Sequence, residues 1–464
     1  MICSESQTHG QAKMDKKEFL QHDQNNGSSA TDKTIIRYQH PSKFLGKKVV
    51  LVIGGGFAGM ATAKKLANRH DVYVILIDER NHHLFQPLLY QVATAGLSPG
   101  DIAVPIRAQF KKTKNIEVHK ICVTEIDLDK KIVRVADREI EFDFVVVACG
   151  AQHSYFANPE WEEFAPGLKT LEQATEIRRR ILSAFEKAES EFDANRQRAF
   201  MTFVIVGGGP TGVEMAGAIS DISRTVLVHD FKRIDPSQAK VILLEAGPRL
   251  LATFSEDLSK HTLMDLHELG VEVRTSARVT HIDKYGLQVG NEFIPSRTKI
   301  WAAGVQATKM TFKPEVSKDR SGRVLVSKDL SIPNYPFAFV VGDMGACEIS
   351  PGKFIPGVAP AALQLGKHAA NVIIATIRNK NRPSFVYRDR GQMATVGKNR
   401  AVAQAGSIKM TGHIAWLAWL FIHVFFLISF KNRTAVLAQW AWNYIFSKRG
   451  ARLITEKGWK LKQR

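Results

Sequence analysis

The sequence predicts an α/β fold with two nested Rossmann-like dinucleotide-binding domains, followed by a C-terminal helical segment that associates with a membrane. Three observations support this prediction. Two glycine-rich turns each follow an apolar strand, the strand–turn–helix–strand order occurs twice with the second copy inside the first, and an apolar, tryptophan-rich stretch precedes a basic tail. The 464 residues exceed one ordinary domain, and the hydrophobic fraction of 45% can build a large core.

The cysteines and the net charge limit the classes of function. The four cysteines are scattered without a CxxC pair, which argues against a zinc site, a redox-active dithiol or a disulfide scaffold. The formal net charge of +19 indicates an anionic partner. Because no nucleic-acid module is recognised, we expect an anionic lipid surface and no nucleic acid. A solvated basic tail is the alternative.

The chain opens with a polar arm, residues 1–46, that shows no hydrophobic period. The arm lacks the apolar run of a secretory signal, and its acidic residues argue against a mitochondrial transit peptide. Such a composition cannot bury enough apolar surface to fold, so we expect the arm to be disordered.

The first domain is expected to be discontinuous, because the chain returns to it after the second domain. It begins with a β-branched apolar run that is typical of a buried parallel strand. Its expected elements are a strand over 47–53, a helix over 57–69, a strand over 72–77, short strands between 120 and 147, and a returning strand over 337–341. We assign residues 47–170 and 305–410 to this domain.

The second domain, residues 171–304, repeats the same order of elements. They are a helical stretch over 171–199, a strand over 203–206, a long helix over 218–240 and a strand over 241–244. Alternating strands and helices imply right-handed crossovers and open parallel sheets.

The first glycine turn fits the pattern G-x-G-x-x-G. Gly54 permits the tight turn, Gly56 lets a pyrophosphate approach the backbone, and Gly59 lets the helix pack closely on the strand. The phosphates are expected on the helix N-terminus, where free N–H groups favour negative charge. Asp78, at the end of the next strand, is placed to bind the ribose hydroxyls.

The second glycine turn, Gly207, Gly209 and Gly212, has the same pattern. Its strand-end acid is Glu245, which lies further along the chain than the usual spacing of about 20 residues. The long helix over 218–240 is expected to account for the difference. A carboxylate here favours NADH over NADPH, and the nearby Arg249 weakens that preference.

The C-terminal segment, residues 411–464, combines apolar helices with basic charge. Residues 414–430 form a 17-residue apolar run, and a second run follows over 435–446. Nine lysines and arginines accompany the single acid Glu456 between residues 431 and 464. A spanning helix needs about 20 residues. We therefore expect two helices in the membrane interface, with a short transmembrane span and a buried hairpin as alternatives.

Five segments of the sequence resemble those of a known family, the type II NADH dehydrogenases, which are monotopic NADH:quinone oxidoreductases. The resemblance covers the chain from about Lys48 to its end. The segments that carry it are VIGGGFAG (52–59), NHHLFQPLLYQVA (81–93), VGGGPTGVE (206–214), VGD (341–343) and PGVAPAALQ (356–364).

The resemblance implies roles for particular residues. FAD is expected on Gly54, Gly56, Gly59 and Asp78, with Asp343 at its ribityl chain or pyrophosphate and Gln86 near the isoalloxazine. NADH is expected on Gly207, Gly209, Gly212 and Glu245. Glu214 matches a glutamate near the stacked nicotinamide, and Gln364 matches the distal glutamine of the quinone motif. Pro360 replaces the first glutamine of that motif, which leaves one quinone contact in doubt.

The implied activity is non-proton-pumping NADH:quinone oxidoreduction in a respiratory chain, with hydride passing from NADH to FAD and electrons to a membrane quinone. The expected location is the cytoplasmic face of a bacterial inner membrane, and the enzyme can be a homodimer. One alternative is a sulfide:quinone oxidoreductase, although Cys149 and Cys347 do not resemble its cysteine pair. A membrane-bound flavin redox sensor is another alternative.

Overall fold

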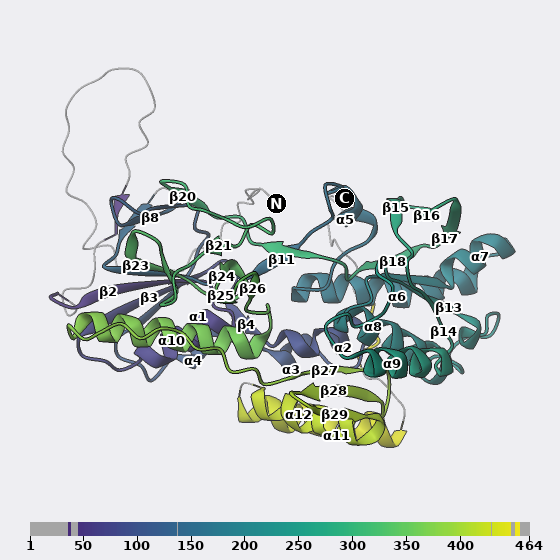
Figure 1. The fold of residues 1–464 in the computed structure, drawn as a ribbon. Helices are drawn as coiled ribbons and strands as arrows, with labels where there is room; N and C mark the ends of the chain where they lie inside the picture. The colour runs from purple at the N-terminus through teal and green to yellow at the C-terminus, as the bar shows by residue number, and fades with distance from the viewer. Residues whose placement is uncertain (1–35, 39–44, 137, 428, 447–450, 455–464) are drawn as a thin grey trace, which may run out of the picture.

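A computed structural model describes residues 36–38, 45–136, 138–427, 429–446 and 451–454. It contains two α/β units side by side and a C-terminal layer beneath them (Figure 1). The predicted α/β fold with parallel Rossmann-like sheets is confirmed. Most of the polar arm lies outside the described residues. Within it, Ile36–Arg37 form β1, which pairs with Arg138–Glu139, so the prediction of disorder is wrong there.

The first unit is built on a six-stranded sheet. Its strands, in spatial order, are β22 (Ser331–Ile332), β23 (Tyr335–Val340), β10 (Phe144–Val147), β2 (Lys48–Ile53), β3 (Val72–Asp78) and β6 (Ile116–Lys120). All neighbours run parallel except β22 and β23. Side chains alternate across β2, so Val50 and Val52 pack toward the helices while Leu51 and Ile53 pack on the other face.

Helices and a second sheet cover the two faces of this unit (Figure 1). The helix face carries α1 (Phe57–Leu66) and α10 (Ala359–Ile377), with the short α4 (Ile106–Gln109) nearby. The other face carries a sheet whose order is β1, β9 (Arg138–Glu141), β8 (Ile132–Val135), β7 (Glu125–Asp127) and β20 (Thr311–Lys313).

The second unit repeats this plan. Its parallel sheet has the order β14 (Val271–Arg274), β13 (Lys240–Leu244), β12 (Thr202–Val206) and β18 (Thr298–Trp301). One face is covered by α6 (Leu171–Ser190), α8 (Pro210–Asp221) and α9 (Glu256–Glu268). The other is covered by an antiparallel meander of β15 (Val279–Ile282), β16 (Gly286–Val289) and β17 (Glu292–Pro295). The internal duplication therefore includes the meander as well as the strand–turn–helix–strand unit.

The prediction of a long helix over 218–240 is wrong. α8 ends at Asp221, a π-helical turn follows over Ile222–Val226, and only a 3₁₀ turn, Pro236–Gln238, is helical beyond it. Apolar residues of this stretch, including Leu227 and Ile234, lie in irregular backbone, and their side chains are buried in the core. Pro236 has no N–H to donate and starts its own turn, which a continuous helix does not allow.

The remaining short elements connect the units. They are β4 (His82–Leu84), a 3₁₀ turn (Gln86–Leu88), α2 (Leu89–Ala93), α3 (Pro99–Ile102), β5 (Ala103–Pro105), β11 (Ala151–His153), α5 (Trp161–Phe164), α7 (Ala194–Phe200), β19 (Val305–Ala307), β21 (Val324–Leu325), a 3₁₀ turn (Gly342–Met344), β24 (Gly345–Ala346), β25 (Glu348–Ser350) and β26 (Lys353–Phe354).

The C-terminal layer consists of one sheet and two helices. They are β27 (Gln392–Thr395), β28 (Ala401–Ala405), β29 (Ile408–Thr411), α11 (Gly412–Phe426) and α12 (Phe430–Phe446). The three strands pair with one another and pack with α11, which moves the domain boundary expected at residue 410 to about 390.

The two predicted C-terminal helices are present, but the first is shorter than the apolar run over 414–430. α11 ends at Phe426, and Ser429, with a φ of 79°, lies in the break before α12. Among the described residues, no helix combines the length and the apolar character needed to cross a bilayer. The basic residues of the tail after 454 lie outside the described chain.

Candidate active site

Both glycine turns lie at the carboxyl edges of parallel sheets, and these two edges face each other. β2 runs parallel to β10, which leads into β11; β12 runs parallel to β18, which leads into β19. β11 and β19 form an antiparallel ribbon between the two units (Figure 1). Open α/β sheets bind ligands at the carboxyl ends of their strands. Two nucleotides held at these turns would therefore approach each other at the ribbon.

The first turn has the geometry of a pyrophosphate cradle. Gly54 has a φ of 105°, which non-glycine residues rarely adopt. A Cβ on Gly59 would lie 1.8 Å from the Gly54 carbonyl oxygen, so a larger residue would push α1 off the turn. A Cβ on Gly56 would meet no protein atom within 4 Å. The space in front of Gly56, at the N-terminus of α1, is therefore open to a phosphate.

Asp78 is positioned by this turn. Its Oδ2 accepts a hydrogen bond of 2.5 Å from the Gly55 N–H, and its Oδ1 accepts one of 2.6 Å from the Arg80 N–H. Burial raises the pKa of the carboxyl group, and the two N–H donors oppose that rise. The carboxylate therefore lies beside the cradle, as a ribose-binding acid requires.

His83 supports the same turn from behind. Its Nδ1 lies 2.8 Å from the Gly55 carbonyl oxygen. A carbonyl can only accept, so Nδ1 carries the proton and Nε2 holds a lone pair. Nε2 is buried and has no hydrogen-bond partner in the part of the chain that the structure describes. Burial lowers the pKa of the imidazole to about 4, so the ring is neutral at physiological pH.

The second turn reproduces the first. Gly207 has a φ of 113°, and a Cβ on Gly212 would lie 1.8 Å from the Gly207 carbonyl oxygen. A Cβ on Gly209 would again meet no protein atom within 4 Å. The turn therefore leaves the same open space at the N-terminus of α8.

Glu245 occupies the place that Asp78 has in the first unit. Its two oxygens accept hydrogen bonds of 2.6 Å from the Gly208 and Gly247 N–H groups. Arg249 does not point its charge at this acid, because its guanidinium donates to the Ala252 and Phe254 carbonyls at 2.7 and 2.8 Å. The Glu245 carboxylate therefore lies beside the second cradle as Asp78 lies beside the first, and its contact with a ribose stays a prediction.

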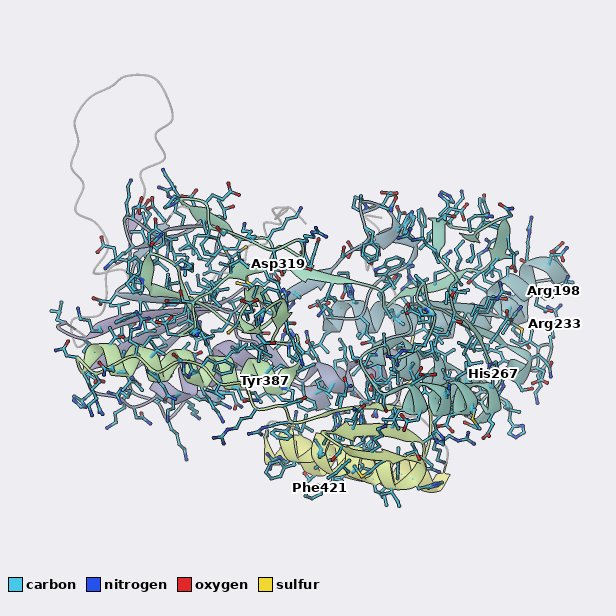
Figure 2. The ribbon with its side chains drawn as sticks, viewed as in Figure 1. Arg198, Arg233, His267, Asp319, Tyr387 and Phe421 are labelled. Carbon is cyan, nitrogen blue, oxygen red and sulfur yellow. The ribbon has the colours of Figure 1, made fainter. Side chains whose placement is uncertain are left out.

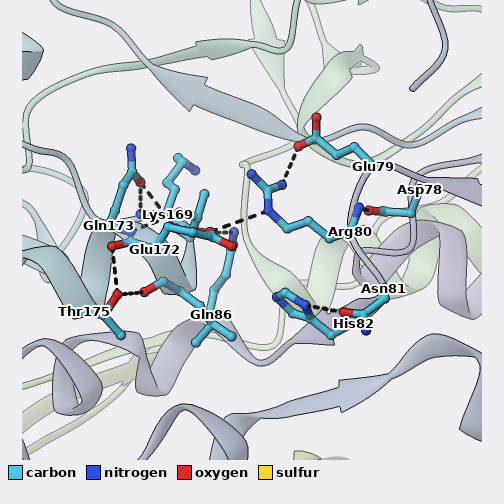
Figure 3. Close-up of polar contacts among 12 residues, drawn as sticks. Asp78, Glu79, Arg80, Asn81, His82, Gln86, Lys169, Glu172, Gln173 and Thr175 are labelled. Atoms are coloured by element: carbon cyan, nitrogen blue, oxygen red, sulfur yellow. Dashed lines mark hydrogen bonds and ion pairs between the residues drawn. The ribbon is translucent and has the colours of Figure 1, made fainter. Parts of the chain in front are cut away.

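Gln86 and Asp343 each interact with Lys169, a residue that the sequence did not single out. The Gln86 amide donates to the Lys169 carbonyl at 3.1 Å, and the Lys169 N–H donates to the Gln173 side chain at 2.9 Å (Figure 3). Burial lowers the pKa of the Lys169 ammonium, and attraction to Asp343 opposes that change. Lys169 is therefore a half-buried cation close to Asp343.

Glu214, in the second turn of α8, lies at the start of a polar chain toward the C-terminal layer. The Thr395 backbone hydrogen-bonds to its carboxyl group, and burial raises the pKa of that group to about 8. The Thr395 hydroxyl lies 3.0 Å from the Tyr90 hydroxyl, which accepts from the Gln91 amide. The Gln91 oxygen accepts from the Trp440 indole of α12 at 2.7 Å. Because its pKa is about 8, the Glu214 carboxyl group at the start of this chain is protonated near neutral pH.

Gln364 lies near the N-terminus of α10, and its amide is engaged with the backbone. Its nitrogen donates to the Arg388 carbonyl at 2.9 Å, and its oxygen accepts from the Arg388 N–H at 3.1 Å. The nitrogen also donates to the Pro360 carbonyl at 3.2 Å. The side chain thus fixes the segment that leads to β27, and its contact with a quinone stays a prediction.

The structure places the predicted residues in separate groups: Asp78 lies beside the first cradle, Glu245 beside the second, and Gln86 and Asp343 near Lys169. Glu214 and Gln364 each bond to a segment at the C-terminal layer. His83 and Tyr90 lie within the family-like segment 81–93 and were not assigned a role there. Lys169 carries no local signal, because only the fold places it beside Asp343.

The described cysteines do not form a redox pair. Cys122, Cys149 and Cys347 are free thiols. Burial raises the pKa of Cys149 to about 12 and that of Cys347 to about 11, so both resist ionisation. Because the thiolate is the nucleophile, these cysteines are poorly suited to attack sulfide-derived sulfur.

Comparisons with known proteins agree with this arrangement. Residues 48–366 match the family described as pyridine nucleotide-disulphide oxidoreductase, and residues 390–449 match the NDH2 C-terminal domain. The chain is 43% identical to a type II NADH:quinone oxidoreductase of Mycobacterium tuberculosis, over 88% of this chain and 90% of that protein. A second such enzyme of the same organism is 40% identical over 90% and 91%.

A solved structure shares the fold. NDH2 from Plasmodium falciparum in complex with NADH superposes with a TM-score of 0.80 at 20% identity, covering 88% of this chain and 100% of that chain. At this identity the likeness supports the fold alone.

Proposed function

The chain belongs to the type II NADH:quinone oxidoreductases of respiratory chains, and we propose that it works with FAD on the first glycine turn, NADH on the second and a membrane quinone as acceptor. The observation that carries this proposal is the pair of open cradles at Gly56 and Gly209, each at the carboxyl edge of a parallel sheet whose neighbouring strand leads into the ribbon of β11 and β19. Each cradle has a strand-end carboxylate beside it, at Asp78 and Glu245.

The cofactor supplies the redox chemistry: when bound, FAD accepts a hydride and passes on two electrons. The residues of this chain orient the two nucleotides and exclude water from their meeting point. Glu245 favours NADH, because a carboxylate accepts hydrogen bonds from the ribose hydroxyls and repels a 2′-phosphate.

Glu214 fits the role of a proton donor. Reducing a quinone to a quinol takes two electrons and two protons, whereas a hydride carries two electrons and one proton. The second proton must come from the protein or from water. The Glu214 carboxyl group is protonated near neutral pH, because burial raises its pKa to about 8. The Thr395 backbone holds this group in place.

The C-terminal helices provide a surface for the membrane from which a quinone would enter. One side of α11 exposes Ile414, Leu417, Phe421 and Phe425, with exposed fractions of 57 to 71%. The opposite side, including Ala415 and Trp419, is buried against the sheet and core. Figure 2 shows Phe421 on the outer side of this layer. Lys431 follows at the start of α12, so the apolar surface is flanked by positive charge.

The absorption spectrum of the purified protein tests the proposed reaction. We expect a flavin spectrum that bleaches on addition of NADH and returns on addition of a short-chain quinone in the absence of oxygen. A protein that keeps its reduced spectrum with quinone would be a flavin sensor rather than a quinone reductase. Bleaching by sulfide would favour the sulfide:quinone alternative.

Binding to lipid vesicles tests the membrane surface. The wild-type protein should sediment with vesicles that contain anionic lipid, and the double variant Leu417→Glu/Phe421→Glu should stay in solution. Phe293→Glu, at an exposed apolar residue of β17 in the meander on the opposite face of the second sheet, is the matched control and should sediment normally. Equal sedimentation of all three proteins would locate the membrane contact elsewhere.

A further inference from the structure

The backbone of Lys169 is fixed by hydrogen bonds, whereas its side-chain ammonium group has no ionic partner among the described residues. Its carbonyl accepts from Gln86 and its N–H donates to Gln173, directly before the start of α6 (Figure 3). Its hydrogen bonds are those of its backbone, and among the described residues its ammonium group forms no hydrogen bond and no ion pair. The structure thus fixes the position of a cation without supplying a counterion within contact distance.

The acids nearby do not neutralise this charge. Glu172, the acid in the first turn of α6, pairs with Arg80 at 3.7 Å. Asp343 attracts the ammonium, but it makes no salt bridge with it. A half-buried ammonium without an ionic partner loses part of its hydration, and an anionic ligand beside it would offset that cost.

The position of Lys169 indicates which ligand that is. Gln86 and Asp343, its neighbours, are the residues expected beside the isoalloxazine and the ribityl chain of FAD. We propose that the Lys169 ammonium stabilises the negative charge that a hydride delivers to the bound flavin. This inference rests on the proposed function, because it requires FAD on the first cradle and NADH on the second.

The charge balance explains why a cation is useful here. NADH loses a hydride, which is two electrons and one proton, and leaves as NAD⁺. The acceptor gains one net negative charge until a second proton arrives. Lys169 keeps its own proton throughout and acts through its field. Its attraction is stronger after hydride transfer than before, so it favours the reduced state and accelerates the transfer.

The midpoint potential of the bound flavin measures this effect directly. Lys169→Gln should lower the equilibrium constant for two-electron reduction by roughly tenfold, which corresponds to about 30 mV. Sulfite adds to the flavin ring as an anion and should bind more weakly by a similar factor. Lys169→Arg should restore both values to within about threefold of wild type. Lys187→Gln, at an exposed lysine of the following helix α6, is the matched control and should match wild type.

The outcomes separate this inference from the proposed function. A wild-type protein without flavin would remove the proposed function itself. A flavin-loaded Lys169→Gln protein with the wild-type potential and sulfite affinity would overturn the role of Lys169 alone. If the Gln variant loses its flavin while the Arg variant keeps it, the charge faces the cofactor, as proposed. Loss of flavin in both variants would show that the shape of Lys169 matters and its charge does not.

Discussion

In the first glycine turn, the Gly55 carbonyl accepts a hydrogen bond from the His83 imidazole, whereas in the second the matching Gly208 carbonyl accepts one of 2.8 Å from the Leu251 backbone N–H. The remaining geometry is the same. Each turn has a left-handed first glycine, a third glycine in contact with the first, and an acid bonded to the middle N–H group. The turns therefore differ in whether a side chain or the backbone holds them.

The two copies share the contacts within the glycine turn and differ in the group that supports the turn from behind. The contacts within the turn are made by glycines and backbone groups, which any nucleotide pyrophosphate requires. The support behind the turn is free to vary. Because His83 is titratable and Leu251 donates from its backbone, the bond to the middle carbonyl is sensitive to pH and to a side-chain change in the first turn and not in the second.

The largest effect should come from filling one cradle at a time. Gly56→Ala and Gly209→Ala each place a methyl group where the structure has no protein atom within 4 Å, so the fold should be retained. The methyl group would occupy the space of the pyrophosphate and weaken its binding by roughly 10- to 100-fold. We expect Gly56→Ala to be purified with little FAD, and Gly209→Ala to keep FAD while NADH binds weakly. Flavin absorbance and NADH titration measure the two losses.

Gly100→Ala is the control for this pair, because a Cβ there also meets open space but lies outside both cradles. Its flavin content and NADH affinity should equal those of wild type. If Gly56→Ala kept a full complement of FAD, the pyrophosphate could not lie at the N-terminus of α1.

Local patterns in the sequence were enough to predict both turns and their acids. A glycine pattern, a β-branched strand and a strand-end acid lie close together along the chain, so their arrangement follows from neighbouring residues. Asp78 and Glu245 are accordingly found beside the turns. The exposed apolar side of α11 is likewise visible in the sequence as an apolar run.

Contacts between distant segments could not be predicted in this way. The prediction of a long helix after α8 was wrong. Apolar residues such as Leu227 and Ile234 lie in an irregular segment there, and their side chains are buried without following a helical period. The contact of Thr395 with Glu214 and the position of Lys169 beside Asp343 depend on how the two units and the C-terminal sheet pack. Hydrophobic periodicity contains no information about such contacts.

A smaller effect should separate the supports of the two turns. Burial lowers the pKa of His83 to about 4, below its value of about 6.5 in an unfolded chain. Between these values the unfolded chain binds more protons, so the stability due to His83 is complete above about pH 6.5 and is lost as the pH falls toward 4. The loss reaches roughly 3 kcal/mol.

His83→Gln removes the titration and keeps an N–H donor for the Gly55 carbonyl. We expect its thermal unfolding, followed by flavin fluorescence, to depend less steeply on pH between 6.5 and 4 than that of wild type. His153 and His423, whose pKa values burial also lowers to about 4, will maintain part of the slope. His267→Gln, at an exposed histidine of α9, should leave the slope unchanged. An unchanged slope in His83→Gln would show that the first turn does not depend on this ring.

The smallest effects concern the choice of nucleotide at the second turn. Glu245→Ala removes the acceptor expected for the ribose hydroxyls, and NADH should bind about tenfold more weakly, the loss of one to two charge-assisted hydrogen bonds. Arg249→Ala should change the ratio of NADH to NADPH affinity by less than about threefold, because the guanidinium is already bonded to the Ala252 and Phe254 carbonyls.

Titration of both nucleotides against both variants distinguishes these roles. Unchanged NADH affinity in Glu245→Ala would remove this acid from the site and end its equivalence with Asp78. A large loss of NADPH affinity in Arg249→Ala would mean that the side chain leaves its own turn to bind a 2′-phosphate. The second turn would then have a mobile, charged side chain in its binding site, while the first has the fixed, neutral ring of His83 behind it.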